Sequence, residues 1–361
     1  MKRFSIPVFV GEVQLGGSAP IVVQSMNNTD TRDVAATLRQ IHDLAECGCE
    51  ITRVAIPDRE AALALADITK GSPIPVVADI HFDYRLALLA MENGAAKIRI
   101  NPGNLGGRGR IAAVAKMAAE RKIPIRVGVN SGSISKEILS QYGGVNRESM
   151  AQSAIMAVEA LEAEEFYNTV ISIKSSDPLL TIESYKLLAE HTKYPLHVGV
   201  TESGTAFEGA IRSAVGIGTL LYEGIGDTIR VSLTSDPVEE VRAAYAILKA
   251  LSLRKRGIRL ISCPTCGRTK VPLIDLAARV ENEVKNLPYD LKIAIMGCAV
   301  NGPGEAREAD IGIAGGDNEF LLFMKGEPIR KIPAETALDE LMREIHILGK
   351  SKQISGDNIT T

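Results

Sequence analysis

The sequence predicts an α/β barrel of the TIM type with eight β/α units, followed by a small α+β domain. Short β-branched segments alternate eight times with helical patterns, within the length of about 250 residues that is typical of this barrel. No G-x-G-x-x-G motif follows the first strand, which disfavours a doubly wound, dinucleotide-binding sheet. After residue 257 the alternation gives way to short strands around a cysteine-containing loop, which indicates a second domain.

The first domain opens with a segment, residues 1–17, whose alternating residues are typical of a β-hairpin. Each barrel strand that follows is short, apolar and bounded by polar or glycine-containing turns. We predict these strands at residues 20–26, 50–56, 75–81, 96–102, 124–130, 169–175, 196–202 and 228–234.

The second domain begins after a short link at residues 254–257. Its predicted strands cover 258–262, 292–296, 310–314, 319–324 and 327–331, and its predicted helices cover 270–286 and 334–348. A domain of this size often gains stability from a metal centre. We therefore expect a barrel at 1–253, a small α+β domain at 258–349 and a polar tail at 350–361.

The bulk composition excludes several classes of protein. The chain has 361 residues and a formal net charge of −3, so no basic field favours nucleic acid. No apolar run has the length of a membrane span, and the N-terminus lacks the apolar core of a secretory signal. Five cysteines, three of them close together in the second domain, indicate ligands in a reducing cytoplasm rather than disulfides.

The cysteines of the second domain have the spacing of metal ligands. Cys263 and Cys266 lie in a CPTC turn, and Cys298 follows the predicted strand at 292–296. Three thiolates do not complete a tetrahedral site, and iron–sulfur clusters usually take four cysteines. Glu305 is the nearest oxygen ligand on a suitable loop, and it would leave one position exchangeable. From these residues alone, an iron–sulfur cluster, a structural zinc site and a set of buried thiols remain open.

Basic residues interrupt the otherwise apolar strands of the predicted barrel. Barrel enzymes carry their chemistry at the C-terminal ends of the strands, so we expect these cations at one mouth. An unpaired buried charge costs several kcal/mol, and Asp79 and Glu202 supply only two anions. The excess of cations predicts a ligand with phosphate groups, whose oxygens suit arginine. The five basic residues are Arg53, Arg99, Arg126, Lys174 and Arg230.

Further polar residues are expected at the same level of the barrel. Cations lower the pKa of a nearby carboxyl group, so Asp79 is expected to be ionised. Glu202 is a candidate for a base or proton relay, and a salt bridge is an equally good interpretation. His81 is suited to donate to a phosphate or to Asp79. The remaining candidates are Asn130, Thr201 and Ser232.

Nine segments together resemble one family, the 4-hydroxy-3-methylbut-2-enyl diphosphate synthases, in their compact two-domain bacterial form. The resemblance covers nearly the whole chain, and the last two segments are the most diagnostic. The segments are VQSMNNTDT (23–31), VADIHFDYRLAL (77–88), IRINPGN (98–104), RVGVNSGS (126–133), SIKSSD (172–177), HVGVTESG (197–204), IRVSLTSDP (229–237), ISCPTCGR (261–268) and MGCAVNGPGEA (296–306).

The resemblance implies an iron–sulfur oxidoreductase of isoprenoid precursor biosynthesis, in the methylerythritol phosphate pathway. Such an enzyme reductively opens and dehydroxylates 2-C-methyl-D-erythritol 2,4-cyclodiphosphate to 4-hydroxy-3-methylbut-2-enyl diphosphate. Reduced flavodoxin or ferredoxin would donate the electrons, and neither is favoured by the residues. The resemblance also implies a homodimer in which the cluster domain of one subunit closes over the barrel of the other.

The resemblance also assigns roles to residues of this sequence. It implies one four-iron, four-sulfur (4Fe-4S) cluster on Cys263, Cys266, Cys298 and Glu305. We expect Glu305 to be displaced by a substrate oxygen during catalysis, and Glu202 to protonate the departing hydroxyl. The substrate diphosphate is expected to meet Arg53, Arg99, Arg126, Lys174, Asn130, Ser232, His81 and Arg230, with Asp79 and Thr201 beside it.

Two other classes of function are consistent with the same residues. One is a non-redox barrel enzyme that acts on a phosphorylated substrate and carries a structural zinc in its small domain. The other is a binding or scaffold protein with a vestigial site, which has no need of so many polar strand ends. Metal and sulfide analysis of anaerobically purified protein separates the first of these from the iron–sulfur enzyme.

Overall fold

The structure is a computed structural model that describes residues 2–357. The chain divides into two compact units, residues 1–254 and residues 255–361. Among the described residues, no helix is both long enough and apolar enough to cross a membrane.

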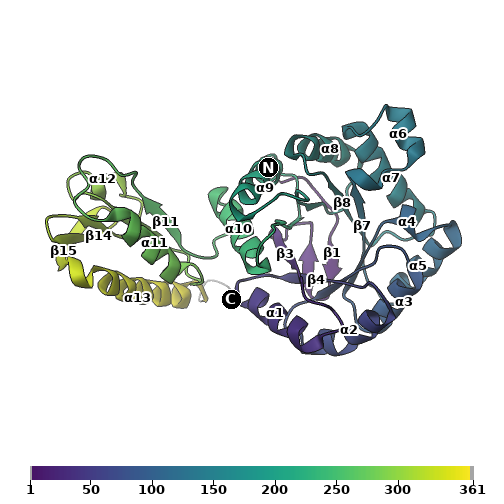
Figure 1. Cartoon of the computed structure of the whole chain (residues 1–361), viewed down its shortest axis with the longest axis horizontal. Coiled ribbons are helices and arrows are strands. Elements are labelled where there is room, and N and C mark those ends of the chain that lie inside the picture. Colours follow the sequence, from purple (N-terminus) through teal and green to yellow (C-terminus); the bar gives the residue numbers. More distant parts are fainter. Residues whose placement is uncertain (1, 358–361) are drawn as a thin grey trace. The chain divides into compact units, whose positions relative to one another are not determined.

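The first unit is a barrel of eight parallel strands surrounded by helices, as Figure 1 shows. The strands follow the order β8-β7-β6-β5-β4-β3-β10-β9, and a bridge between Ile171 and Leu196 joins the two ends of this sheet. The predicted fold class is therefore confirmed. The strands are β3 (Val22–Met26), β4 (Ile51–Ala55), β5 (Val76–Asp79), β6 (Lys97–Ile100), β7 (Ile125–Asn130), β8 (Thr169–Lys174), β9 (His197–Val198) and β10 (Thr228–Ile229).

Short connections with aspartate caps lead from the strand ends into many of the helices. Asp33, Asp58, Asp83, Asp177 and Asp236 each accept a backbone N–H in the first turn of a helix. Such caps satisfy N–H groups that have no partner within the helix. The helices are α1 (Val34–Glu46), α2 (Arg59–Gly71), α3 (Tyr84–Glu92), α4 (Pro102–Leu105), α5 (Arg108–Glu120), α6 (Lys136–Tyr142), α7 (Arg147–Glu162), α8 (Pro178–His191), α9 (Ala206–Tyr222) and α10 (Pro237–Ala250).

An N-terminal hairpin closes the base of the barrel. Its strands β1 (Val8–Val10) and β2 (Val13–Leu15) pair antiparallel, as the sequence predicts. Val8, Val10 and Leu15 form one buried apolar cluster with residues from the first halves of the barrel strands, which include Val22 and Ile51. The base of the barrel is therefore apolar, and the polar interior of the barrel lies between this base and the mouth.

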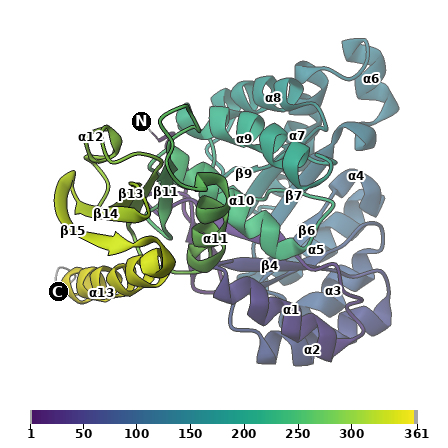
Figure 2. The ribbon, with the colours of Figure 1, turned by 60° about the vertical axis from the view of Figure 1, so that its left-hand side comes forward.

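The second unit is a mixed five-stranded sheet of the order β11-β12-β13-β14-β15. The first three strands are parallel and the last two pair antiparallel. Apolar residues of α11 and α13 share one core cluster with the sheet, and Figure 2 shows α13 alongside β14 and β15. The elements are β11 (Arg259–Ser262), α11 (Leu273–Val284), β12 (Lys292–Met296), α12 (Gly302–Glu305), β13 (Ile311–Gly315), β14 (Glu319–Met324), β15 (Glu327–Pro333) and α13 (Ala337–Asp357).

Two parts of the chain differ from the sequence-based expectation. The strands β9 and β10 have two residues each, far shorter than the predicted 196–202 and 228–234, because irregular backbone follows each of them at the mouth. The last helix extends to Asp357, into the segment 350–361 that was expected to be a polar tail. Residues 358–361 of that tail lie outside the described part of the chain.

Candidate active site

A buried carboxylate, Asp79, organises the mouth of the barrel. It ends β5, and its oxygens lie 3.2 Å from Arg99 Nη1, 3.7 Å from Arg53 Nε and 3.6 Å from His81 Nε2. Burial alone would raise the pKa of Asp79, but Arg53, His81, Arg99 and Arg126 hold that pKa well below its ordinary value. Burial lowers the pKa of Arg53 to about 10, although Asp79 opposes this shift. The aspartate is therefore a fixed negative charge that orients cations.

A second carboxylate, Glu240 of α10, holds the fifth cation. Its oxygens lie 3.2 Å from Arg230 Nη2 and 3.3 Å from Arg230 Nε. Glu240 also accepts hydrogen bonds from Ser25 Oγ at 2.9 Å and from the backbone N–H of Leu233 at 3.1 Å. The sequence interpretation counted Glu202, with Asp79, among the anions that balance the five cations; among the described residues, Arg230 pairs with Glu240 instead.

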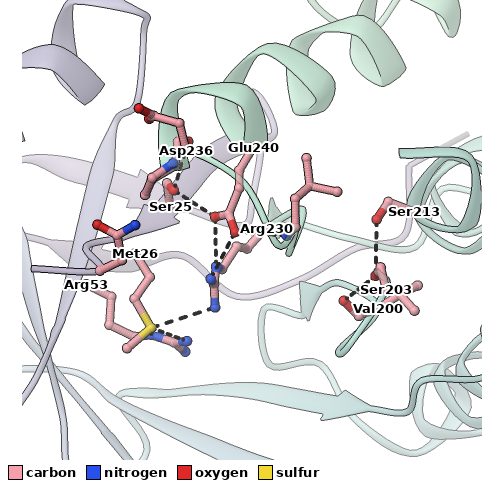
Figure 3. Close-up of polar contacts among 12 residues, drawn as sticks. Ser25, Met26, Arg53, Val200, Ser203, Ser213, Arg230, Asp236 and Glu240 are labelled. Atoms are coloured by element: carbon pink, nitrogen blue, oxygen red, sulfur yellow. Dashed lines mark hydrogen bonds and ion pairs between the residues drawn. The ribbon is translucent and has the colours of Figure 1, made fainter. Parts of the chain in front are cut away.

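A methionine sulfur lies between two of the guanidinium groups. Met26 Sδ is 2.8 Å from Arg53 Nη2 and 3.7 Å from Arg230 Nη1, and Figure 3 shows both side chains directed toward it. A thioether is only a weak acceptor, so it leaves both guanidinium groups with donors for a stronger acceptor. Figure 3 also shows Glu240 on the far side of Arg230 from this sulfur.

Three further cations lie deeper in the barrel with no carboxylate beside them. Arg126, Lys97 and Lys174 are all more than nine-tenths buried, and none forms an ion pair with a described residue. Arg126 Nε and Nη1 have no hydrogen-bond partner, and Lys97 Nζ has Gln24 Oε1 at 3.4 Å. Burial, and then the neighbouring cations, lower the pKa of all three groups well below the ordinary values. This interior is short of negative charge.

A cavity of about 270 Å³ opens at the mouth beside these cations. Five of the predicted site residues line it together, namely His81, Arg99, Asn130, Thr201 and Glu202. Glu202 has a left-handed backbone with φ of 52°, which is uncommon for a residue other than glycine. The other predicted residues do not line this cavity. Asp79 pairs with its lining residues Arg99 and His81, and Arg53 pairs with Asp79. Arg126 and Lys174 are buried, Arg230 pairs with Glu240, and Ser232 is half-buried.

In the second unit, the parallel strands β11 and β12 bring the cysteine segments to one edge of the sheet. Ser262 pairs with Ile295, so the residues that follow each strand lie side by side. The Gly297 N–H lies 3.2 Å from Cys263 Sγ, and the Gly297 carbonyl accepts from Lys270 N–H at 3.0 Å. The CPTC turn therefore packs directly against the segment that carries Cys298.

The donors on this edge suit an iron–sulfur cluster in type. A backbone N–H already points at the Cys263 sulfur, as in cluster sites. Hydrogen bonding by the Arg268 backbone lowers the pKa of the exposed Cys266 thiol toward the thiolate that binds metals. Glu305 ends α12 and is exposed. Within residues 2–357, no three His, Cys, Asp or Glu side chains are arranged around one point as for a single metal ion.

Comparison with known proteins follows the same division of the chain. Residues 5–245 match the GcpE TIM-barrel domain, and residues 259–347 match the GcpE protein C-terminal domain. The chain belongs to the GcpE family.

Relatives of this GcpE chain are similar along nearly its full length. A protein of Ruminiclostridium cellulolyticum is 60% identical over 336 residues, which cover 93% of this chain and 95% of the relative. A protein of Maridesulfovibrio salexigens is 57% identical over 347 residues, which cover 96% of this chain and 97% of the relative. A protein of Caldanaerobacter subterraneus is 55% identical over 352 residues, covering 98% and 99%. Each relative is named 4-hydroxy-3-methylbut-2-en-1-yl diphosphate synthase (flavodoxin).

Several residues of the GcpE site were missed from the sequence. Lys97 interrupts an apolar strand as the five chosen cations do, so the same criterion would have found it. Glu240 lies on a helix ten residues beyond Arg230, where no local pattern distinguishes it from the half-buried Glu239. The cavity also takes lining residues, from the segments 98–104 and 126–133, that the sequence analysis did not name as candidates: Asn101, Asn104, Ser131, Gly132 and Ser133.

Proposed function

We propose that this protein is a 4-hydroxy-3-methylbut-2-enyl diphosphate synthase that draws its electrons from reduced flavodoxin. The observation that carries the proposal is the barrel mouth, where Arg53 and Arg99 pair with a single carboxylate, Asp79, and the buried Arg126 behind them has no ion pair with a described residue. This excess of positive charge suits a cyclic diphosphate, whose oxygens accept from guanidinium groups in pairs. The flavodoxin is named for the relatives described above, which share 55–60% of their aligned residues with this chain.

The reaction consumes two electrons and two protons. It opens the cyclic diphosphate and releases one hydroxyl group as water. Arg53, Arg99, Arg126, Lys174 and Arg230 bind the diphosphate and stabilise the negative charge that grows on it as the ring C–O bond breaks. His81, Asn130, Thr201 and Ser232 complete the contacts with the substrate. Glu202, on the cavity wall, delivers the proton to the departing hydroxyl oxygen.

A four-iron, four-sulfur cluster would be held by Cys263, Cys266, Cys298 and Glu305. When bound, such a cluster supplies the electrons one at a time. The Gly297 N–H and the turn around Cys266 position the thiolates for it. Free thiols belong to a reducing compartment, so we place the protein in the cytoplasm. We also expect it to be a homodimer, as the family resemblance implies.

The proposal is tested with protein purified without oxygen. We expect iron and acid-labile sulfide in equal amounts, and conversion of 2-C-methyl-D-erythritol 2,4-cyclodiphosphate only when reduced flavodoxin is present. Zinc without sulfide would favour the alternative, a non-redox barrel enzyme with a structural metal. Cys298→Ser should lose the iron and sulfide yet still bind inorganic pyrophosphate, because the barrel cations are untouched. Sedimentation velocity measures the expected dimer.

A further inference from the structure

A buried glycine of the barrel wall, Gly128, lies directly beneath one of the anion-binding cations. It stands on β7 between Arg126 and Asn130, and alternation along a strand places all three on the same, inner face. The neighbouring strand β6 carries Arg99 on its inner face, and the two strands pair in register at Arg99 and Arg126. Arg99 therefore has to cross the position of Gly128 to reach the centre of the barrel.

The backbone gives no reason for a glycine at this position. Gly128 is absent from the glycines with positive φ, and it lies in the middle of a regular strand, where glycine is ordinarily unfavourable. The reason lies in the space above it. A Cβ added to Gly128 would lie 2.6 Å from Arg99 Nε, 3.0 Å from Nη2 and 3.2 Å from Cζ. The guanidinium group occupies the volume that any other side chain would fill.

The contacts of Arg99 depend on this placement. Arg99 is 8% exposed, its Nη1 lies 3.2 Å from Asp79 Oδ1, and it is among the residues that line the cavity. Its Nε is buried without a hydrogen-bond partner, so no hydrogen bond fixes that edge of the group. The three atoms nearest to the added Cβ all belong to this flexible side chain, so an alanine would displace the guanidinium and leave the strand in place.

We propose that Gly128 is a positioning residue for diphosphate binding, which acts by leaving the space in which the Arg99 guanidinium lies. This inference rests on the proposed function, since it assumes that Arg99 binds an anion. Gly199 is similar, because a Cβ there would lie 2.7 Å from Lys174 Nζ, but it would also lie 2.5 Å from the Arg230 carbonyl oxygen. Gly128 is the cleaner test, since only one side chain has to move.

The experiment is a double-mutant cycle on the full-length protein, purified without oxygen and with its cluster. Inorganic pyrophosphate is the probe, and its Kd is measured by calorimetry for the wild type, Gly128→Ala, Arg99→Ala and the double variant. Gly218→Ala is the matched control: Gly218 lies on the outer helix α9, and its added Cβ would meet only Ile247 Cγ2 of α10, at 4.0 Å. Thermal unfolding of each variant reports on the fold.

We expect Gly128→Ala to raise the Kd roughly tenfold or more, as loss of a charge-assisted hydrogen bond does. In the Arg99→Ala background the same change should have no further effect, since the group that it displaces is gone. KM for the cyclic diphosphate should rise in the same proportion. If Gly128→Ala instead lowers the Tm strongly, the double variant should recover it, because the crowding atoms have been removed.

The outcomes separate the inference from the proposed function. If Arg99→Ala weakens pyrophosphate binding but Gly128→Ala does not, the inference is overturned and the proposed anion site stands. Equal losses from Gly128→Ala in both backgrounds, or a double variant that fails to recover its Tm, also overturn it. If Arg99→Ala binds pyrophosphate as tightly as the wild type, Arg99 is not an anion-binding residue, and both its assigned role in the proposed function and the inference are overturned.

Discussion

The ion pair between Glu240 and Arg230 offers a direct test of how the mouth is stabilised. Glu240→Gln keeps the size of the side chain but removes its charge, and it turns one accepting oxygen into a donor. The wild-type oxygens accept from Arg230 at 3.2 and 3.3 Å, from Ser25 at 2.9 Å and from Leu233 at 3.1 Å. Glutamine has a single accepting oxygen for these donors and leaves the guanidinium without a counter-charge.

The expected loss of stability follows from the burial of the pair. Breaking a buried ion pair costs about 3–5 kcal/mol. The Arg230 side chain keeps 16% of its exposure, whereas that of Glu240 keeps 4%, so water can reach the stranded cation and the lower end applies. For a unit of this size, about 3 kcal/mol corresponds to a fall in Tm of roughly 6–12 °C.

The assay is thermal unfolding of the full-length protein followed by circular dichroism. Glu239→Gln is the control, since Glu239 is the preceding residue of α10 and pairs with Arg242 at the surface, where its side chain is 43% exposed. A surface pair of this kind contributes about 1 kcal/mol or less. Equal shifts in Tm for the two variants would refute the assignment of Glu240 as the buried counter-charge.

Three other perturbations probe the same site. The pKa of Asp79 is held below its unfolded value, so its contribution to stability is complete above about pH 4 and is lost as the pH falls further; Asp79→Asn should remove that acid-dependent loss in unfolding curves. Lys97 is fully buried without an ion pair, so Lys97→Met should raise the Tm by about 2 °C or more, and a fall would contradict its unfavourable burial. Glu202→Gln should lower kcat at unchanged affinity for pyrophosphate, and a pure change in KM would exclude proton delivery.

Much of the barrel could be predicted because its information is local. Each strand is a short apolar run closed by a turn, and each helix repeats its apolar residues along one face. The cations at positions 53, 99, 126, 174 and 230 were found because a charge within an apolar strand is conspicuous in any window of a few residues. Their common location then follows from the topology of parallel strands.

The pairing of those cations could not be predicted, because it is decided by tertiary contacts. Met26 and Arg53 are 27 residues apart in sequence, and Arg230 reaches the same sulfur from 204 residues away. Glu240 was indistinguishable from other helix carboxylates until α10 was seen to return over the end of β10. Likewise, Gly128 looked like any strand glycine until the neighbouring arginine was found to lie across it.

The apolar base formed by the N-terminal hairpin has a consequence for substrate entry and product release. Among the described residues, Val8, Val10 and Leu15 close the base of the barrel, so a ligand enters from the opposite end, the mouth. The product must therefore depart by the path along which the next reactant arrives, so the two cannot pass each other. Substrate therefore binds only after product has left, and product that remains at the mouth acts as a competitive inhibitor.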